Sequence, residues 1–245
     1  MDVYWLEQIE PDVPVESDWL GARETLCLST LRFRKRRADW LLGRWTAKCM
    51  LATWSGTPAY PKDLAKIEIR AAPSGAPEAY FQDRPAAVAI SISHRDGRAF
   101  CTLSTGSAQL GCDLEAVEPR SNAFVADYFV PEEQALVGKA SVTDRAWVST
   151  LIWSAKESAL KALQTGLRLD TRSVVVTPSE MSTETHHWHP LQVRNLQGQL
   201  FNGWWQLSGA FVKTVVCVPS PQPPILLKNG IPGECRRSQF ANRTS

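Results

Sequence analysis

The sequence predicts an α+β fold, with a helix and antiparallel strands in each half of the chain. Apolar residues recur at helical spacing between Val148 and Leu163, which is typical of an amphipathic helix packed against a core. Alternating small and apolar residues from Ala87 to Ser93 predict a strand, and Asp96-Gly97 shortly after it predicts a hairpin turn. The 245 residues, 44% of them hydrophobic, suffice for one large domain or two ordinary ones.

Charge and cysteine content bear on the compartment more than on partners. The formal net charge is only +2, and the six cysteines show no Cys-x-x-Cys spacing. Cys101, Cys112 and Cys217 lie in apolar, strand-like runs, as expected of reduced cysteines in a cytosolic core. Residues 1–10 lack the basic start and apolar run of an export signal, and no segment has the length needed to cross a bilayer. We therefore expect a cytoplasmic protein without membrane contacts.

The first half begins with a strand at residues 2–9 and a basic helix at residues 31–54. Five of the six residues from Arg32 to Arg37 are basic, and Arg44 and Lys48 follow in the same helix. Such a helix fits a solvated face, a nucleic-acid surface or a clamp for ligand phosphates, and the helix alone leaves all three open. A further strand is expected at residues 65–70, followed by a loop at 71–77.

Two more strands, at residues 98–104 and 110–115, are predicted to follow the strand at 87–93 and to form a meander with it. Ser93 and His94 lie at the end of the first of these strands, where a side chain can point into a cleft. An isolated histidine in such a place is often only a hydrogen-bonded loop residue. These two residues therefore stay weak candidates on their own.

Two carboxylates share one face of the last of these strands. The strand period of two places Asp113 and Glu115 on one side, with Cys112 and Leu114 on the other. Neighbouring carboxylates repel each other, so a cation between them would be stabilising. Oxygen ligands without Cys or His favour magnesium or manganese over zinc, although Asp-x-Glu is also common on solvated strands. Glu157 from a helix would complete a three-carboxylate cluster with positions left open for substrate phosphates.

The helix at residues 148–163 has a second, polar face. Trp153, Glu157 and Lys161 succeed one another at steps of four, so an acid lies one turn from a base above an aromatic ring. Alone, this pattern also fits a surface Glu–Lys pair that contributes only about 0.2–0.5 kcal/mol. A helix at 127–137 with Pro131 precedes it, Gly166 is expected to cap it, and strands follow at 173–177, 192–195, 200–207 and 210–218.

Three histidines and the C-terminal segment carry little functional signal. His186, His187 and His189 suggest a metal site, but the loop is polar and we expect no carboxylate or cysteine to accompany them, which argues against one. From Pro219 onward, prolines and polar residues predict a poorly ordered tail.

Two motifs in the second half carry a family resemblance. Residues 111–115 match Gly-x-Asp-x-Glu, and residues 153–161 match Trp-x-x-Lys-Glu-(x)3-Lys. Residues 91–94, Ser-Ile-Ser-His, and Arg44 after a glycine are weaker matches. Together these motifs resemble the 4'-phosphopantetheinyl transferases, in particular the two-lobed monomeric group that activates peptide and polyketide synthetases. The likeness runs from about residue 31 to residue 218.

The resemblance implies two similar α+β lobes related by a pseudo-two-fold axis, each with an antiparallel sheet packed on a long helix. The N-terminal lobe would span residues 1–107 and the C-terminal lobe residues 108–218, with a disordered Pro-rich tail at 219–245. The active site would lie in the cleft between the lobes, and the protein would be a monomer.

The resemblance also implies the reaction, that of a holo-[acyl-carrier-protein] synthase. Such a transferase moves the 4'-phosphopantetheine arm of coenzyme A to a serine hydroxyl of an apo carrier protein and releases adenosine 3',5'-bisphosphate. Phosphoryl transfer needs charge neutralisation and alignment more than covalent help. The implied magnesium ligands are Asp113, Glu115 and Glu157. The implied contacts to coenzyme A are Arg44, Ser93 and His94 for the 3'-phosphate and Lys161 for the pyrophosphate.

Two details of this chemistry stay open. Glu157 is the implied base for the serine proton, but magnesium would lower its pKa, and a metal-bound water that relays the proton is the alternative. In relatives the loop before the Ser-His strand often reads Gly-Lys-Pro, whose lysine contacts coenzyme A phosphates, whereas residues 75–77 read Gly-Ala-Pro. The missing contact at Ala76 is worth about 1–3 kcal/mol. Arg37 or Lys48 could replace it.

Two other functions fit part of the pattern. A magnesium-dependent phosphohydrolase could use the same three carboxylates, and a nucleic-acid-binding protein could use the basic run at Arg32–Arg37. Neither explains the whole motif at residues 153–161, so we expect a carrier protein and coenzyme A as partners and no nucleic acid. Fatty-acid, polyketide and peptidyl carriers are all acidic and mainly helical, so a partly basic cleft rim does not distinguish among them.

Overall fold

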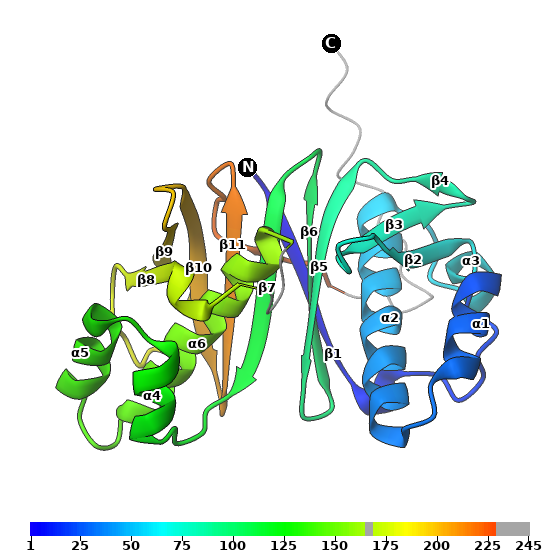
Figure 1. Cartoon of the computed structure of the whole chain (residues 1–245). Helices are drawn as coiled ribbons and strands as arrows, with labels where there is room; N and C mark the ends of the chain where they lie inside the picture. Colours follow the sequence, from blue (N-terminus) through cyan, green and yellow to red (C-terminus); the bar gives the residue numbers. More distant parts are fainter. Residues whose placement is uncertain (165–168, 229–245) are drawn as a thin grey trace, which may run out of the picture.

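Two mainly antiparallel sheets stand next to each other, and one long helix packs against each of them (Figure 1). The computed structural model describes residues 1–164 and 169–228. The predicted α+β class is confirmed.

The first sheet combines strands from near both ends of the chain with a central hairpin. In spatial order it contains β12 (Ile225–Leu226), β1 (Val3–Ile9), β6 (Arg98–Thr105) and β5 (Val88–Arg95). Helix α2 (Arg34–Ser55) packs on this sheet, and its Met50 and Leu51 share a core with Cys101 and Leu103. Around α2 lie η1 (Glu10–Asp12), α1 (Ala22–Thr30), α3 (Pro61–Leu64) and a small sheet of β2 (Ile67–Ala71), β3 (Pro77–Phe81) and β4 (Arg84–Pro85).

The second sheet is built from the second half of the chain. In spatial order it contains β7 (Gln109–Ala116), β11 (Phe211–Val218), β10 (Leu200–Ser208), β9 (His189–Asn195) and β8 (Val174–Pro178). Helix α6 (Arg145–Ala162) packs on it, and its Leu151 and Ile152 share a core with Phe201 and Trp205. The remaining elements are α4 (Asn122–Tyr128), α5 (Pro131–Lys139) and η3 (Thr171–Ser173).

The predicted meander is wrong in its third strand. Strands β5 and β6 form the expected hairpin, but β6 is hydrogen-bonded to β1 on one edge and to β5 on the other. No edge of β6 is left for β7, which pairs with β11 in the second sheet. Strand β7 still lies close to β5, and the Cys112 N–H donates to Ser91 Oγ at 3.0 Å across the gap between the sheets.

The helix predicted at residues 127–137 is two helices, α4 and α5. Phe129 and Val130 between them have extended backbone, because the residue before a proline is disfavoured in helical conformation. Pro131 then occupies the first turn of α5, where its missing N–H costs nothing. The predicted cap at Gly166 lies outside the described residues.

The tail predicted to be disordered from Pro219 does not begin there. Strand β12 pairs in parallel with β1, and the Leu227 N–H donates to the Trp5 carbonyl oxygen at 2.9 Å. An open strand edge favours such pairing, and Leu227 also packs against the first core. The segment after β11 therefore crosses from the second sheet to the first. Residues 229–245 lie outside the described residues.

In each half, a buried lysine of the long helix forms an ion pair with a glutamate of the shorter helix that precedes it in the chain. Lys48 of α2 pairs with Glu24 of α1, and Lys156 of α6 pairs with Glu133 of α5 at 2.8 Å. Both lysines also donate to backbone carbonyl groups. The two glutamates accept backbone N–H groups of Gly21 and Ile69, and of Val130 and Val176, respectively. Removing one partner of such a pair costs about 3–5 kcal/mol, because the other charge stays buried.

Gly111 allows strand β7 to approach helix α6 closely. A Cβ atom at this position would overlap the carbonyl oxygen of Ser158 and lie 2.7 Å from the backbone nitrogen of Ala162. Both obstacles are helix backbone, which cannot rotate away. The glycine of the Gly-x-Asp-x-Glu motif is therefore required by the packing of β7 on α6.

The substitution Gly111→Ala tests this contact. We expect it to destabilise the protein by about 3 kcal/mol or more, since the helix must move away from the strand. Urea unfolding followed by circular dichroism measures the change. Gly138→Ala in α5 is the control, because nothing lies within 4 Å of its added Cβ and alanine favours a helix by up to about 1 kcal/mol. Wild-type stability of the Gly111 variant would show that the contact is unimportant.

Candidate active site

The polar face of α6 lies against the two predicted carboxylates of β7. Trp153 Nε1 donates to Glu115 Oε1 at 3.0 Å, and two turns further along Lys161 Nζ donates to Asp113 Oδ1 at 2.8 Å. Glu157 lies between Trp153 and Lys161 on the same helix face. The packing of α6 on β7 thus brings together three carboxylates that are distant in the sequence.

Each of these carboxylates has one buried oxygen without a hydrogen bond in the described parts of the chain. These oxygens are Asp113 Oδ2, Glu115 Oε2 and Glu157 Oε1. Buried acceptors are normally satisfied, and a hard divalent cation satisfies carboxylate oxygens. Among the described residues no three His, Cys, Asp or Glu side chains already stand at metal-binding positions. The donor set therefore fits magnesium, while the three side chains still have to turn toward a common centre.

The charges at this site strongly influence one another. Burial and the repulsion of Asp113 raise the pKa of Glu157 to about 7, against the attraction of Lys161. Burial and Asp113 also raise the pKa of Glu115, although Arg95 and the Trp153 N–H oppose this. For Lys161, burial lowers the pKa, but the attraction of Asp113 and other neighbours outweighs it, and the net pKa is raised. Glu157 therefore changes its protonation state near neutral pH.

Two arginines that sequence reasoning missed lie beside Glu115. Arg95 Nη1 and Arg120 Nη2 are 3.7 and 3.9 Å from Glu115 Oε2. The Arg120 guanidinium also stacks on Phe124 at 4.5 Å and on Trp153 at 5.3 Å. Arg95 directly follows His94 on β5, and Arg120 follows the Asp-x-Glu strand, so nearness to the motifs is the signal that could have found them.

The structure separates Ser93 from His94, which the resemblance assigned to one pocket. The buried hydroxyl of Ser93 donates to Asp113 Oδ1 at 2.8 Å. His94 lines a different cavity together with Arg44. Burial lowers the pKa of His94, with Asp39 opposing, so this imidazole is neutral at pH 7.

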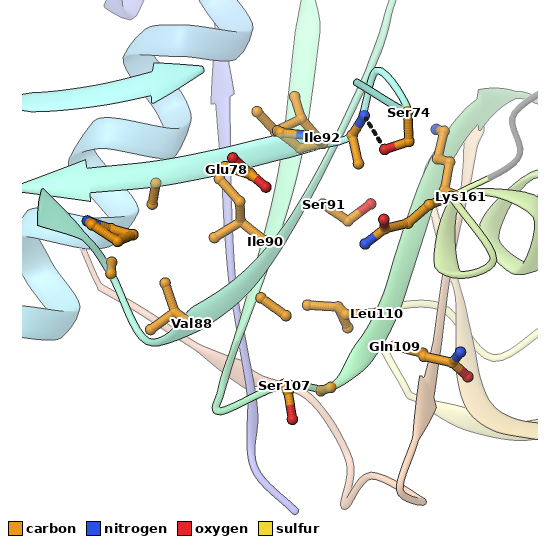
Figure 2. A pocket seen from close by; sticks show the side chains of 18 of the residues that line it. Ser74, Glu78, Val88, Ile90, Ser91, Ile92, Ser107, Gln109, Leu110 and Lys161 are labelled. Carbon is orange, nitrogen blue, oxygen red and sulfur yellow. Dashed lines mark hydrogen bonds between the residues drawn. The ribbon is translucent and has the colours of Figure 1, made fainter. Parts of the chain in front are cut away.

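Two cavities of about 600 Å³ each lie on either side of β5. The first cavity lies between β5 and β7 and is called the β5–β7 cavity. Its lining is mainly apolar, and Figure 2 shows Ser91 of β5, Leu110 of β7 and Lys161 of α6 around it. The α2–β5 cavity is lined by Phe33, Lys35, Arg36, Asp39, Trp40, Gly43, Arg44, Ala71, Gly75, Pro77, Ile92 and His94. Since Gly75 and Pro77 line both cavities, the loop without the family's lysine stands between them.

The two residues named as possible replacements for that lysine lie away from both cavities. Lys48 is fully buried and bound to Glu24. Arg37 donates to the Leu28 carbonyl oxygen at 3.1 Å and lines neither cavity. Their neighbours Lys35 and Arg36 line the α2–β5 cavity instead. Arg37 points elsewhere because each residue of a helix is rotated by about 100° from the one before it.

The histidines of the second half lie on and before β9. His189 is buried against Trp205, with ring centroids 4.7 Å apart. Its Nδ1 is 3.7 Å from Glu180 Oε2, so the expectation that no carboxylate accompanies these histidines is wrong.

The segment that contains β7 and α6 resembles a known protein family. In this α+β fold, the acidic residues and Lys161 lie where helix α6 packs on strand β7. Residues 109–216 match the family model of the 4'-phosphopantetheinyl transferase superfamily, a span that includes β7 and α6. The matched residues, somewhat less than half of the chain, thus carry the pattern of this superfamily, which indicates a transferase of the phosphopantetheinyl type. No curated protein matches the chain. Within the described residues, no helix has both the length and the apolar character of a membrane span.

The raised pKa of Glu157 gives the stability of the metal-free protein a pH dependence. The folded chain holds this proton up to about pH 7, whereas an unfolded chain releases it near pH 4.3. Stability therefore falls as the pH rises between these values and is level above them. We expect Glu157→Gln to abolish this fall and to be about 1–3 kcal/mol more stable than wild type at pH 8.

Urea unfolding at pH 4.5 and pH 8 in the presence of a chelator measures this difference. The exposed Glu16→Gln is the control and should leave the pH dependence unchanged. Equal gains from both substitutions would contradict the assignment to Glu157.

Proposed function

We propose that this protein transfers the 4'-phosphopantetheine arm of coenzyme A to a serine hydroxyl of an apo carrier protein. The reaction would require magnesium, with manganese as a substitute, and would release adenosine 3',5'-bisphosphate. The observation that carries the proposal is the packing of β7 on α6, which brings the carboxyl groups of Asp113, Glu115 and Glu157 together beside Lys161. A cavity that contains Arg44 and His94 lies next to them. The superfamily match of residues 109–216 supports the proposal.

Asp113, Glu115 and Glu157 would hold the magnesium ion. When bound, the ion would neutralise charge on the pyrophosphate of coenzyme A. The side chain of Lys161 is 29% exposed and lines the β5–β7 cavity, and it would turn from Asp113 to a phosphate oxygen when coenzyme A is bound.

The 3'-phosphate of coenzyme A would bind in the α2–β5 cavity. Arg44 offers a planar guanidinium whose buried Nε has no hydrogen-bond partner among the described residues. His94, neutral at pH 7, would donate one ring N–H. Lys35 and Arg36 line the same cavity and would supply the charge that Ala76 does not.

Glu157 is our candidate for the base. Its pKa of about 7 suits removal of the serine proton near neutral pH, directly or through a water molecule. Binding of magnesium would lower this pKa and weaken the base. The proton transfer therefore depends on how tightly Glu157 holds the ion.

We also propose that the chain consists of two related lobes, residues 1–107 and 108–218. The two buried lysine–glutamate pairs support this proposal, since they occupy equivalent places in α1–α2 and in α5–α6. Residues 45–48 read Trp-Thr-Ala-Lys and residues 153–156 read Trp-Ser-Ala-Lys, with the paired lysine last in both. The sheet orders β1-β6-β5 and β7-β11-β10 are equivalent as well.

The partner would be an acidic, mainly helical carrier of fatty-acid, polyketide or nonribosomal peptide biosynthesis, bound by a monomer. Exposed basic residues at the start of α2 lie at the edge of the α2–β5 cavity and would attract such a surface.

Intact mass spectrometry tests the transfer. Purified apo carriers are incubated with coenzyme A, magnesium and the full chain, and the wild-type protein should add the mass of one phosphopantetheine group. We expect Glu157→Ala to abolish the added mass while its circular dichroism spectrum stays unchanged. Release of free phosphate without added mass would indicate a hydrolase, and an active Glu157→Ala variant would argue against the site. Nucleic-acid binding that Asp113→Ala leaves unchanged would favour a different function.

Ala76→Lys tests the departure from the family's loop. We expect this substitution to tighten coenzyme A binding roughly tenfold, since one charge-assisted contact is gained. Arg36→Gln should weaken binding by a similar factor, and Ala76→Lys in that background should restore it. Isothermal titration with coenzyme A measures these constants, with Ala76→Gln as the uncharged control. Equal effects of lysine and glutamine at position 76 would show that charge is not what this loop lacks.

A further inference from the structure

The two carboxylates of β7 are held in the same asymmetric way. Asp113 Oδ1 accepts hydrogen bonds from Ser93 Oγ and Lys161 Nζ, both at 2.8 Å. Glu115 Oε1 accepts from Trp153 Nε1 at 3.0 Å. The second oxygen of each group, Asp113 Oδ2 and Glu115 Oε2, is buried and makes no hydrogen bond to a described residue. Each carboxylate therefore has one oxygen fixed by hydrogen bonds and one oxygen without a hydrogen bond, and that of Glu115 faces the guanidinium groups of Arg95 and Arg120.

The donors that fix these oxygens stand on elements other than β7. Ser93 belongs to β5 of the first sheet, and Trp153 belongs to α6. The last torsion of an Asp or Glu side chain has a broad energy minimum, so packing alone does not set its plane. A donor on a second rigid element does set it. The planes of the two carboxylates thus depend on β5 and α6.

Trp153 is itself held by its surroundings. Its ring packs edge-on against Phe124 and Tyr128, with centroids 5.1 and 5.4 Å away, and the Arg120 guanidinium lies 5.3 Å from it. These contacts fix the direction of the indole N–H. The Trp153 side chain is therefore a rigid donor to Glu115.

Ser93 and Lys161 differ in how firmly they hold Asp113. Ser93 is 7% exposed and sits inside a paired strand, whereas the lysine side chain is 29% exposed and lines a cavity. The lysine is also a cation and repels a divalent ion bound to the same carboxylate. A neutral hydroxyl does not. Ser93 is thus the donor that can stay on Asp113 when the lysine moves to a phosphate.

We infer that Ser93 and Trp153 are positioning residues for the metal ligands, which rests on the proposed function. Ser93 holds one oxygen of Asp113 and Trp153 one oxygen of Glu115, and each leaves the second oxygen without a hydrogen bond and so available to magnesium. Ser93 therefore acts through Asp113 rather than as a contact to coenzyme A. Outer residues of this kind typically change metal affinity by about 10- to 100-fold when they are removed.

Manganese binding to the full chain, followed by electron paramagnetic resonance with and without coenzyme A, tests this inference without any turnover. We expect Ser93→Ala and Trp153→Phe each to weaken manganese binding about 10- to 100-fold, and Ser93→Thr, which keeps the hydroxyl, to restore most of the affinity. Coenzyme A affinity measured without metal should change less than twofold in Ser93→Ala, because its hydroxyl does not contact that ligand.

Two matched controls stand on the same helix as Trp153. Trp147 donates its indole N–H to Asp144 and Ser149 donates its hydroxyl to the Ala146 carbonyl oxygen, both at 3.0 Å. Trp147→Phe and Ser149→Ala should therefore leave manganese affinity unchanged. Thermal unfolding of every variant shows whether the fold is intact.

Asp113→Asn separates failure of this inference from failure of the metal site. If Asp113→Asn abolishes manganese binding while Ser93→Ala and Trp153→Phe bind like wild type, the positioning roles are wrong and the metal site stands. If wild type and Asp113→Asn bind manganese equally, the metal site is wrong and the positioning roles fall with it. Loss of coenzyme A affinity in metal-free Ser93→Ala would overturn the role of Ser93 and indicate a direct ligand contact.

Discussion

The close approach of strand β7 to helix α6 is the contact on which the site depends. Gly111 permits it, because any side chain there would meet the helix backbone. Once strand and helix are in contact, the long side chains of Trp153 and Lys161, which lie on one face of α6, can reach residues two apart on one face of β7. Trp153 then reaches Glu115 and Lys161 reaches Asp113, with Glu157 between them. A separation larger by one side chain would break both hydrogen bonds and leave the carboxylates apart.

The buried lysine–glutamate pairs hold the two long helices in similar settings, yet carboxylates gather in only one of these settings. After Trp-Ser-Ala-Lys in α6 comes Glu157, whereas after Trp-Thr-Ala-Lys in α2 comes Cys49. Cys49 is buried, and burial raises the pKa of its thiol to about 12. A neutral thiol beside the amide of Gln8 offers no charge for a hard cation. The first half instead contributes Arg44 and His94 from the other side of β5.

Local patterns predicted the strands of the two central hairpins and both long helices, because their periodicity reflects one buried face. These patterns gave wrong or missing predictions where an element depends on its contacts with other elements. Strand β7 was expected beside β6, but pairing depends on which edges are free, and β1 had taken that edge. Helix α1 was missed because its apolar face is short, and its stability comes from Glu24, which binds Lys48 and two backbone N–H groups. Strand β12 was missed because a two-residue strand has no periodicity.

The sequence by itself determined which side chains are candidates for the chemistry, since the two motifs name Asp113, Glu115, Glu157 and Lys161 by type and spacing. Spacing within one strand or one helix fixes which residues share a face. It says nothing about distances between elements, because those depend on packing over the whole chain. Only the tertiary structure decided that Ser93 faces Asp113, that Arg95 and Arg120 flank Glu115, and that Lys48 is buried rather than available to a ligand.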